Sequence, residues 1–208
     1  MYYKHPRMPH LPWSPGRTKD DRVLDSVDHF NGIQVVATIK MDGENTTLYR
    51  NHIHARSMDS RDHESRHWVK AFHNNIRIFI PYEWRICGEN LYAKHSIHYK
   101  GLPSYFLVFS VWNENNMCLS WEETELFCSK LGLEMVQELF RGIWKPAMQE
   151  AMDKLSYIKG HEGYVIRSAG EFHYDDFEMN VAKYVRENHV QTDKHWMHSE
   201  LVKNELRK

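Results

Sequence analysis

The chain has 208 residues, 41% of them hydrophobic, which is enough for one substantial domain or two small ones. Its formal net charge is −1 with histidine neutral, which argues against a non-specific nucleic-acid binder with a global basic excess. The three cysteines lack C-x-x-C spacing, no signal peptide is recognisable, and no apolar run could span a bilayer. These features predict a cytoplasmic protein with reduced thiols and no membrane association.

The N-terminal residues 1–18 are rich in proline, histidine and aromatic residues, which does not indicate regular secondary structure. We expect an extended arm that packs against the body through its rings. Contact with a substrate strand is the alternative, and we favour packing.

The first strand is predicted at the apolar residues 33–39, and it ends at Lys40, directly before Asp42 and Gly43 in a tight turn. A lysine placed in this way can act as a nucleophile if its surroundings hold it unprotonated, since the pKa of free lysine is about 10.4. Gly43 would permit a close approach of the backbone. The alternative is an ordinary solvated lysine, because a four-residue K-x-D-G match recurs by chance.

Five later segments read as short strands, and each carries one residue suited to nucleotide chemistry. From the sequence pattern alone, the two glutamates in this set, Glu89 and Glu162, could be ordinary charges at strand edges. The phenylalanine lies in an apolar run, whose pattern alone favours a core position over contact with a ligand, and Phe106 is a rival for the same role. The residues are Arg56 in 54–57, Glu89 in 86–92, Phe109 in 105–112, Glu162 in 162–167 and Lys183 in 181–186.

Helices are predicted between these strands. Apolar spacing indicates one over residues 60–80, and Ser120 with Glu123 has the form of a capping box for a second. A third begins at Pro146, and residues 191–208 suggest a C-terminal helix. Strands mixed with helices without strict alternation predict an α+β fold.

In their order and local contexts, these segments resemble motifs I, III, IIIa, IV and V of the covalent nucleotidyltransferases, which include RNA ligases, DNA ligases and mRNA capping enzymes. The resemblance covers residues 35–186, and residues 40–47 and 88–93 are most similar to small ATP-dependent RNA ligases of bacteria and phages. It implies a single nucleotidyltransferase domain over residues 1–208, with antiparallel sheets and flanking helices. Because only about twenty residues follow Arg186, we expect no OB domain.

The resemblance also implies the chemistry. Lys40 would attack the α-phosphorus of ATP to form lysyl-AMP, while Lys183 would contact the α-phosphate and lower the pKa of Lys40. Glu89 and Glu162 would bind Mg²⁺ or Mn²⁺ through hard oxygen ligands. Glu89 could also hold the ribose hydroxyls.

The remaining motif residues would bind the nucleotide. Phe109 would stack on adenine, Arg56 would bind ribose or an incoming phosphate, and Asp42 and Gly43 would shape the turn. Two departures from the family pattern stand out. Ser110 follows Phe109 where an acid is common, and Val185 replaces the second lysine of motif V. Arg186 or Lys194 could take over that lysine's role.

The function that follows is an ATP-dependent RNA ligase joining 5′-phosphate and 3′-hydroxyl RNA ends, free or in a nicked duplex. A partner protein could heal the ends or supply an additional domain. Alternatives are a nick-sealing DNA ligase, a GTP-using capping enzyme, and a non-catalytic nucleic-acid-binding module. A histidine-rich metal-binding protein is the last, but His95 and His98 lack a cysteine or acid at ligand spacing, so we favour surface or RNA-facing histidines.

Overall fold

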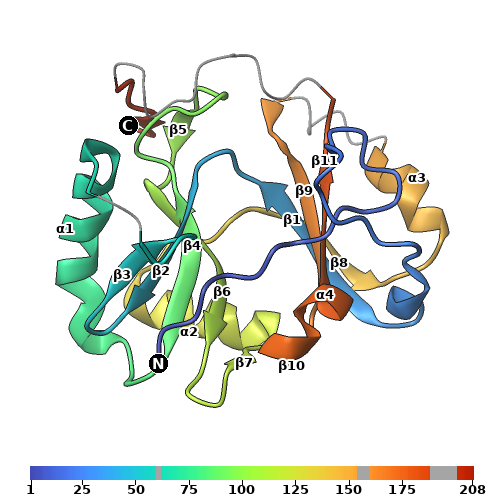
Figure 1. Cartoon of the computed structure of the whole chain (residues 1–208), viewed down its shortest axis with the longest axis horizontal. Helices are drawn as coiled ribbons and strands as arrows, with labels where there is room; N and C mark the ends of the chain where they lie inside the picture. The colour runs from blue at the N-terminus through green and yellow to red at the C-terminus, as the bar shows by residue number, and fades with distance from the viewer. Residues whose placement is uncertain (60–61, 154–159, 188–200) are drawn as a thin grey trace.

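Two antiparallel sheets lie side by side in the computed structural model, which describes residues 1–59, 62–153, 160–187 and 201–208 (Figure 1). The four-stranded sheet has the order β11-β9-β1-β8. Its α3 helix lies on the outer side, at the right of Figure 1. The bounds are β1 (Gln34–Lys40), β8 (Glu138–Ile143), β9 (Gly163–Ser168), β11 (Val181–Val185) and α3 (Ala147–Asp153).

The six-stranded sheet has the order β10-β7-β6-β4-β2-β3, and α1 lies on its outer side. The two sheets and the helices beside them confirm the predicted α+β fold with antiparallel sheets and flanking helices. The bounds are β2 (Glu44–Tyr49), β3 (Ile53–Ala55), β4 (Arg85–Asn90), β6 (Phe106–Trp112), β7 (Met117–Cys118), β10 (Phe172–His173) and α1 (His67–Ile76).

The turn at residues 41–43 carries the chain from β1 in one sheet to β2 in the other. Lys40 therefore lies where the two sheets meet. Apolar side chains from both sheets form the core between them, among them Val36 and Ile39 from β1 and Leu107 from β6. This core fixes the sheets beside the end of β1.

The first two predicted helices are present. The capping box at Ser120 and Glu123 is present and opens α2 (Trp121–Leu131), and Gly132 ends this helix with a φ of +64°. The first predicted helix begins later than residue 60, as η2 (Glu64–Arg66), continues as α1 and ends with η3 (Arg77–Phe79). In the part of the chain that the structure describes, no helix has the length and apolar character needed to cross a membrane.

The remaining helices and strands are short. They are η1 (Asp28–Phe30), β5 (Lys100–Leu102), η5 (Tyr174–Asp176), α4 (Phe177–Asn180) and β12 (Glu205–Leu206).

The C-terminal segment differs from the helix expected over residues 191–208. Residues 191–200 lie outside the described residues, and residues 201–208 include β12, which pairs with β5. The buried side chain of Asn204 explains the extended form. Its amide donates to the carbonyl of Leu91 at 2.8 Å and its oxygen accepts from the backbone N–H of Tyr99 at 2.8 Å. These tertiary hydrogen bonds override the helical spacing of the sequence.

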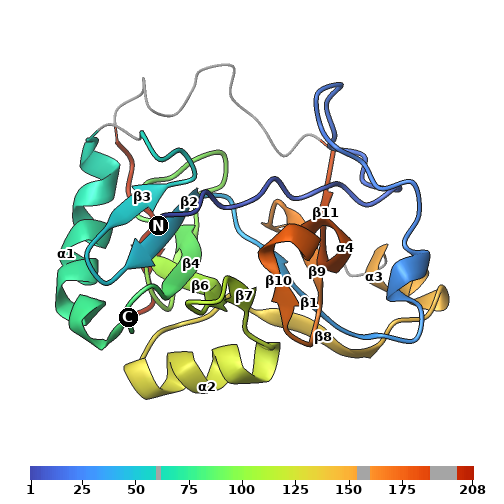
Figure 2. The ribbon, with the colours of Figure 1, turned by 60° about the horizontal axis from the view of Figure 1, so that its bottom comes forward.

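The N-terminal arm crosses from the six-stranded to the four-stranded sheet, as the dark blue segment of Figure 2 shows, with α2 on the other side of the sheets. Residues 1–9 have no regular secondary structure. Leu11 is fully buried, and the Trp13 indole N–H donates to the Tyr164 hydroxyl at 2.9 Å. The arm adds to the free edge of β11, since the Lys183 N–H donates to the Pro9 carbonyl at 2.9 Å.

Candidate active site

Lys40, the last residue of β1, forms an ion pair with Glu162, which directly precedes β9. Lys40 Nζ lies 2.5 Å from Glu162 Oε2, and both side chains are mostly buried. Strand register explains the contact, because Lys40 pairs with Gly163 across β1 and β9. Burial alone lowers the pKa of Lys40, but Glu162, Glu89 and Asp42 outweigh it and raise that pKa. Lys40 is therefore an ammonium here, and the depressed pKa implied by the resemblance is not found.

Glu89, in β4, faces the same ammonium from the other sheet. Its Oε1 accepts a hydrogen bond from the Gly43 N–H at 3.2 Å. Burial raises the pKa of Glu89 to about 8, and the charges of Glu162 and Asp42 act in the same direction while Lys40 opposes them. The raised pKa shows that the carboxylate form of Glu89 lacks nearby positive charge, which a divalent cation bound through oxygen ligands would supply.

Lys183, in β11, is the second lysine of the site. Its Nζ lies 3.9 Å from Asp21 Oδ1. Burial lowers the pKa of Lys183, and Lys40 and Arg56 act in the same direction. Arg56 follows β3 on the opposite sheet and is exposed. The three cations thus lie close enough to affect one another, which suits the binding of a polyanion.

The turn after Lys40 is fixed by Asp42 and Gly43. Asp42 Oδ2 accepts hydrogen bonds from the backbone N–H groups of Ser96 and Ile97, at 2.7 and 2.8 Å. A Cβ on Gly43 would lie 2.6 Å from the carbonyl oxygen of Asn90. The close backbone approach expected at Gly43 is therefore present, and Asp42 ties the turn to a neighbouring loop.

Phe109 lies at a β-bulge in β6, on the same face of the strand as Leu107. Cys87 pairs with Ser110 and Gly88 with Val108, so Phe109 is an extra residue in β6. Because the extra residue changes which face the following side chains occupy, Phe109 and Ser110 both line the space between the sheets.

Phe106, the rival candidate, lies in the core on the other face of β6. It is 1% exposed and packs beside Phe72 of α1, with ring centroids 5.8 Å apart. Phe109 is only half-buried. Of the two rings, the structure brings Phe109 to the cavity.

A cavity of about 530 Å³ unites these residues. It lies between the two sheets, with contributions from β1, β2, β4, β6, β9 and β11. Glu162 reaches it through its ion pair with Lys40, and the Asp42 carboxylate binds the loop at residues 96–97. The predicted residues that line the cavity directly are Lys40, Gly43, Arg56, Glu89, Phe109 and Lys183.

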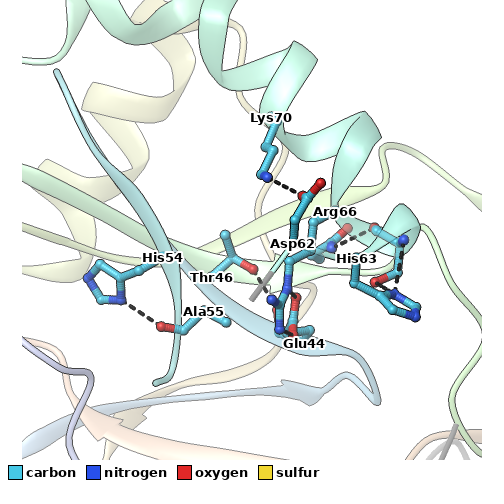
Figure 3. A network of polar contacts seen from close by, with 10 residues as sticks. Glu44, Thr46, His54, Ala55, Asp62, His63, Arg66 and Lys70 are labelled. Carbon is cyan, nitrogen blue, oxygen red and sulfur yellow. Dashed lines mark hydrogen bonds and ion pairs between the residues drawn. The ribbon is translucent and has the colours of Figure 1, made fainter. Parts of the chain in front are cut away.

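Two polar residues of the cavity were missed by the sequence reasoning, although they directly follow the Lys40 turn. Asn45 lines the cavity, and its buried Oδ1 has no hydrogen-bond partner among the residues that the structure describes. Glu44 lines it too and accepts from Arg66 through two hydrogen bonds, one of them 2.7 Å from Nε to Oε2 (Figure 3). Asn45 and Glu44 could have been predicted from their position directly after the turn, but nothing in the sequence links Arg66 to Glu44.

The histidines and the end of motif V have other contacts. His95 lines the cavity, whereas His98 Nε2 donates to a backbone carbonyl at 3.2 Å. Over the described ranges, no group of three or more histidine, cysteine or acidic side chains could hold a metal alone. Arg186 Nε donates at 2.7 Å to the carbonyl of the residue before Glu162, so it supports that loop. Lys194 lies outside the described residues.

Comparison with known families decides the classification. The family model of RNA ligases matches residues 33–185. The chain belongs to the RNA ligase family. The matched region includes all eight residues predicted for the site, from Lys40 to Lys183. No curated protein sequence gives this RNA ligase family member a significant match.

Solved RNA ligases share the fold. A variant of the Naegleria gruberi RNA ligase with ATP and Mn matches with a TM-score of 0.58 and 14% identity over 89% of this chain and 61% of that chain. Another variant of that ligase, also with ATP and Mn, matches with a TM-score of 0.55 and 15% identity over 79% of this chain and 53% of that chain. An archaeal ATP-dependent RNA ligase matches with a TM-score of 0.57 and 18% identity over 82% of this chain and 48% of that chain. This family member therefore spans about half the length of the solved ligases it matches.

Proposed function

We propose that this protein is an ATP-dependent RNA ligase that joins a 5′-phosphate to a 3′-hydroxyl through a lysyl-AMP intermediate and an adenylated 5′ end. The observation that carries the proposal is the convergence of motif residues from distant parts of the chain on one cavity. Solved ligases of the same fold hold ATP and Mn, which supports ATP and a divalent cation as cofactors.

Lys40 is the proposed nucleophile of the first step. Its Nζ attacks the α-phosphorus, so that a P–N bond forms and the P–O bond to pyrophosphate breaks. The ammonium must first lose its proton to solvent, and its contact with Glu162 Oε2, at 2.5 Å, must give way to the cation that Glu162 would hold. Lys183 and Arg56 stabilise the negative charge of the phosphates from opposite sheets.

The nucleoside lies between the sheets in this proposal. Phe109 from the six-stranded sheet stacks on adenine, and Val165 from the four-stranded sheet lines the same cavity. Glu89 holds the ribose hydroxyls. Asp42 and Gly43 keep the turn in the shape that brings Lys40 to the α-phosphate.

Glu89 and Glu162 are the residues that would hold Mg²⁺ or Mn²⁺. Their carboxylates would supply the hard oxygen ligands that these cations prefer. When bound, the cation would neutralise phosphate charge at the site.

RNA ends are the proposed substrates for the later steps. The enzyme transfers AMP from Lys40 to the 5′-phosphate, and the 3′-hydroxyl then displaces AMP. Arg56 is exposed at the rim, where an incoming phosphate would arrive. Both free ends and a nick in a duplex fit this chemistry, and a partner protein that heals ends would supply the 5′-phosphate.

The test is covalent labelling with α-labelled ATP and Mg²⁺, after pyrophosphate treatment to remove AMP already bound. We expect intact mass to show the gain of one adenylyl group, lost in Lys40→Ala and kept in the control Lys100→Ala, which changes an exposed lysine of β5. Persistent labelling of Lys40→Ala would remove the nucleophile assignment. Labelling by GTP alone would favour a capping enzyme, and no adduct with either nucleotide would favour a non-catalytic binding module.

Sealing assays then identify the strand. With 5′-phosphorylated RNA, DNA and nicked duplexes of each, we expect joined RNA as the main product. Sealing of nicked DNA but not of RNA would favour the DNA ligase alternative.

A further inference from the structure

His5, in the N-terminal arm, forms part of the wall of the nucleotide cavity. The residue is 6% exposed and lines the cavity beside Phe109. Its ring lies edge-on to Phe109 with centroids 5.3 Å apart, and edge-on to Phe177 at 5.4 Å. A base stacked on Phe109 would therefore lie close to His5.

The hydrogen bonding of His5 leaves one nitrogen as an acceptor. His5 Nδ1 lies 3.1 Å from the carbonyl oxygen of Pro6, and because a carbonyl can only accept, Nδ1 carries the proton. Over the described ranges, Nε2 has no hydrogen-bond partner. Burial lowers the pKa of His5 to about 4, and nearby Arg85 and Arg56 act in the same direction, so the ring stays neutral near pH 7.

The arm holds His5 in this position from both sides. Before it, the Tyr174 hydroxyl donates to the Lys4 carbonyl at 2.7 Å. After it, the Pro9 carbonyl accepts from the N–H of Lys183 at 2.9 Å. Because the ring is already fixed, an arriving ligand loses little binding energy to ordering it.

We propose that His5 selects the nucleobase, its Nε2 accepting a hydrogen bond from the exocyclic amino group of an adenine stacked on Phe109. The inference rests on the proposed function, which it deepens by naming the residue that prefers ATP over GTP. Guanine carries a carbonyl oxygen at the same ring position, so two acceptors would face each other. Protonating Nε2 would add a charge to a buried ring, and moving the proton from Nδ1 would break the bond to Pro6.

The test removes the acceptor, His5 Nε2, by substitution and the donor, the adenine amino group, by a change of ligand. Calorimetry would measure the binding of three α,β-methylene triphosphates, which cannot transfer their nucleotide: adenosine, guanosine and purine riboside, which lacks the amino group. Wild type is compared with His5→Phe, which keeps a ring but no acceptor, and with His5→Ala. His98→Ala is the control, because His98 bonds a carbonyl outside the cavity.

We expect wild type to prefer the adenosine analogue over the purine analogue by about 10-fold and over the guanosine analogue by at least that factor. In His5→Phe and His5→Ala both preferences should fall to within about 2-fold, with affinity for the purine analogue nearly unchanged. Equal losses for all three ligands would show a merely structural role, and preferences kept in both variants would overturn the inference while leaving the ligase proposal intact. Failure of wild type to bind any of the three would overturn both.

Discussion

At the scale of single residues, the Arg66–Glu44 pair tests how an enclosed charge depends on its partner. Arg66 makes two parallel hydrogen bonds to Glu44, and both side chains are mostly buried. The bonds to Glu44 raise the pKa of Arg66. In Arg66→Ala the carboxylate would remain beside the cavity without its cation. We therefore expect the free energy of unfolding to fall by about 3 kcal/mol in urea denaturation at pH 7.

Two further variants isolate the cause. Arg66→Lys keeps the charge but not the planar fork, so a smaller loss of about 1 kcal/mol is expected. Arg207→Ala removes an exposed arginine 3.4 Å from Glu134, where the expected change is within about 0.5 kcal/mol. Equal losses in Arg66→Ala and Arg207→Ala would contradict the role of burial.

Residues whose function depends on local context could be predicted from the sequence, whereas those defined by distant contacts could not. Lys40 was found because a strand and a turn surround it in the sequence. His5 and Phe109 meet only in the folded chain, and so do Arg66 and Glu44. Proximity also reversed one expectation, since the carboxylates around Lys40 raise its pKa.

At the scale of the element, the two faces of β6 give its two phenylalanines different tasks. Phe109→Ala removes a half-buried ring from the cavity, so we expect ATP affinity to fall by about 10-fold with a modest loss of stability. Phe106→Ala empties a core position that is 1% exposed. It should cost about 3–5 kcal/mol of unfolding free energy. Calorimetry with an ATP analogue and urea denaturation measure the two effects.

The opposite pattern would return Phe109 to the core. If Phe109→Ala kept full ATP affinity, or if Phe106→Ala weakened binding as strongly at a temperature where it is folded, the two faces of β6 would not separate binding from packing.

Elements with local signals were predictable, and elements made by pairing were not. The capping box gave α2 its start, and Gly132 its end. The bulge exists only in the register of β4 against β6, and β12 exists because Asn204 bonds to residues near β4 and β5. Helical spacing at the C-terminus was a weaker influence than these contacts.

At the scale of the whole molecule, the arm connects the two sheets and holds two neutral histidines. His5 lies at the cavity, and His10 bonds the Ser14 hydroxyl through Nδ1 at 2.8 Å. Burial lowers the pKa of each to about 4; Lys183 acts in the same direction on His10, while Asp21 opposes it. A released arm would return both histidines to a pKa near 6.5. The docked arm therefore takes up fewer protons than the released arm.

Acid should release the arm for this reason. Because both folded pKa values are depressed, the docked state is most stable above about pH 6.5 and loses stability as pH falls from there toward 4. Between pH 7 and pH 5 each histidine should weaken docking by about 2 kcal/mol.

Hydrogen exchange of the Leu11 amide, which bonds the Lys183 carbonyl at 2.8 Å, reports the opening of the arm once corrected for the intrinsic rate. A protein carrying both His5→Gln and His10→Gln should lose this pH dependence, whereas His98→Gln should keep it. Protection of Leu11 that stays constant from pH 7 to pH 5 in the wild type would mean that the arm does not open in this way.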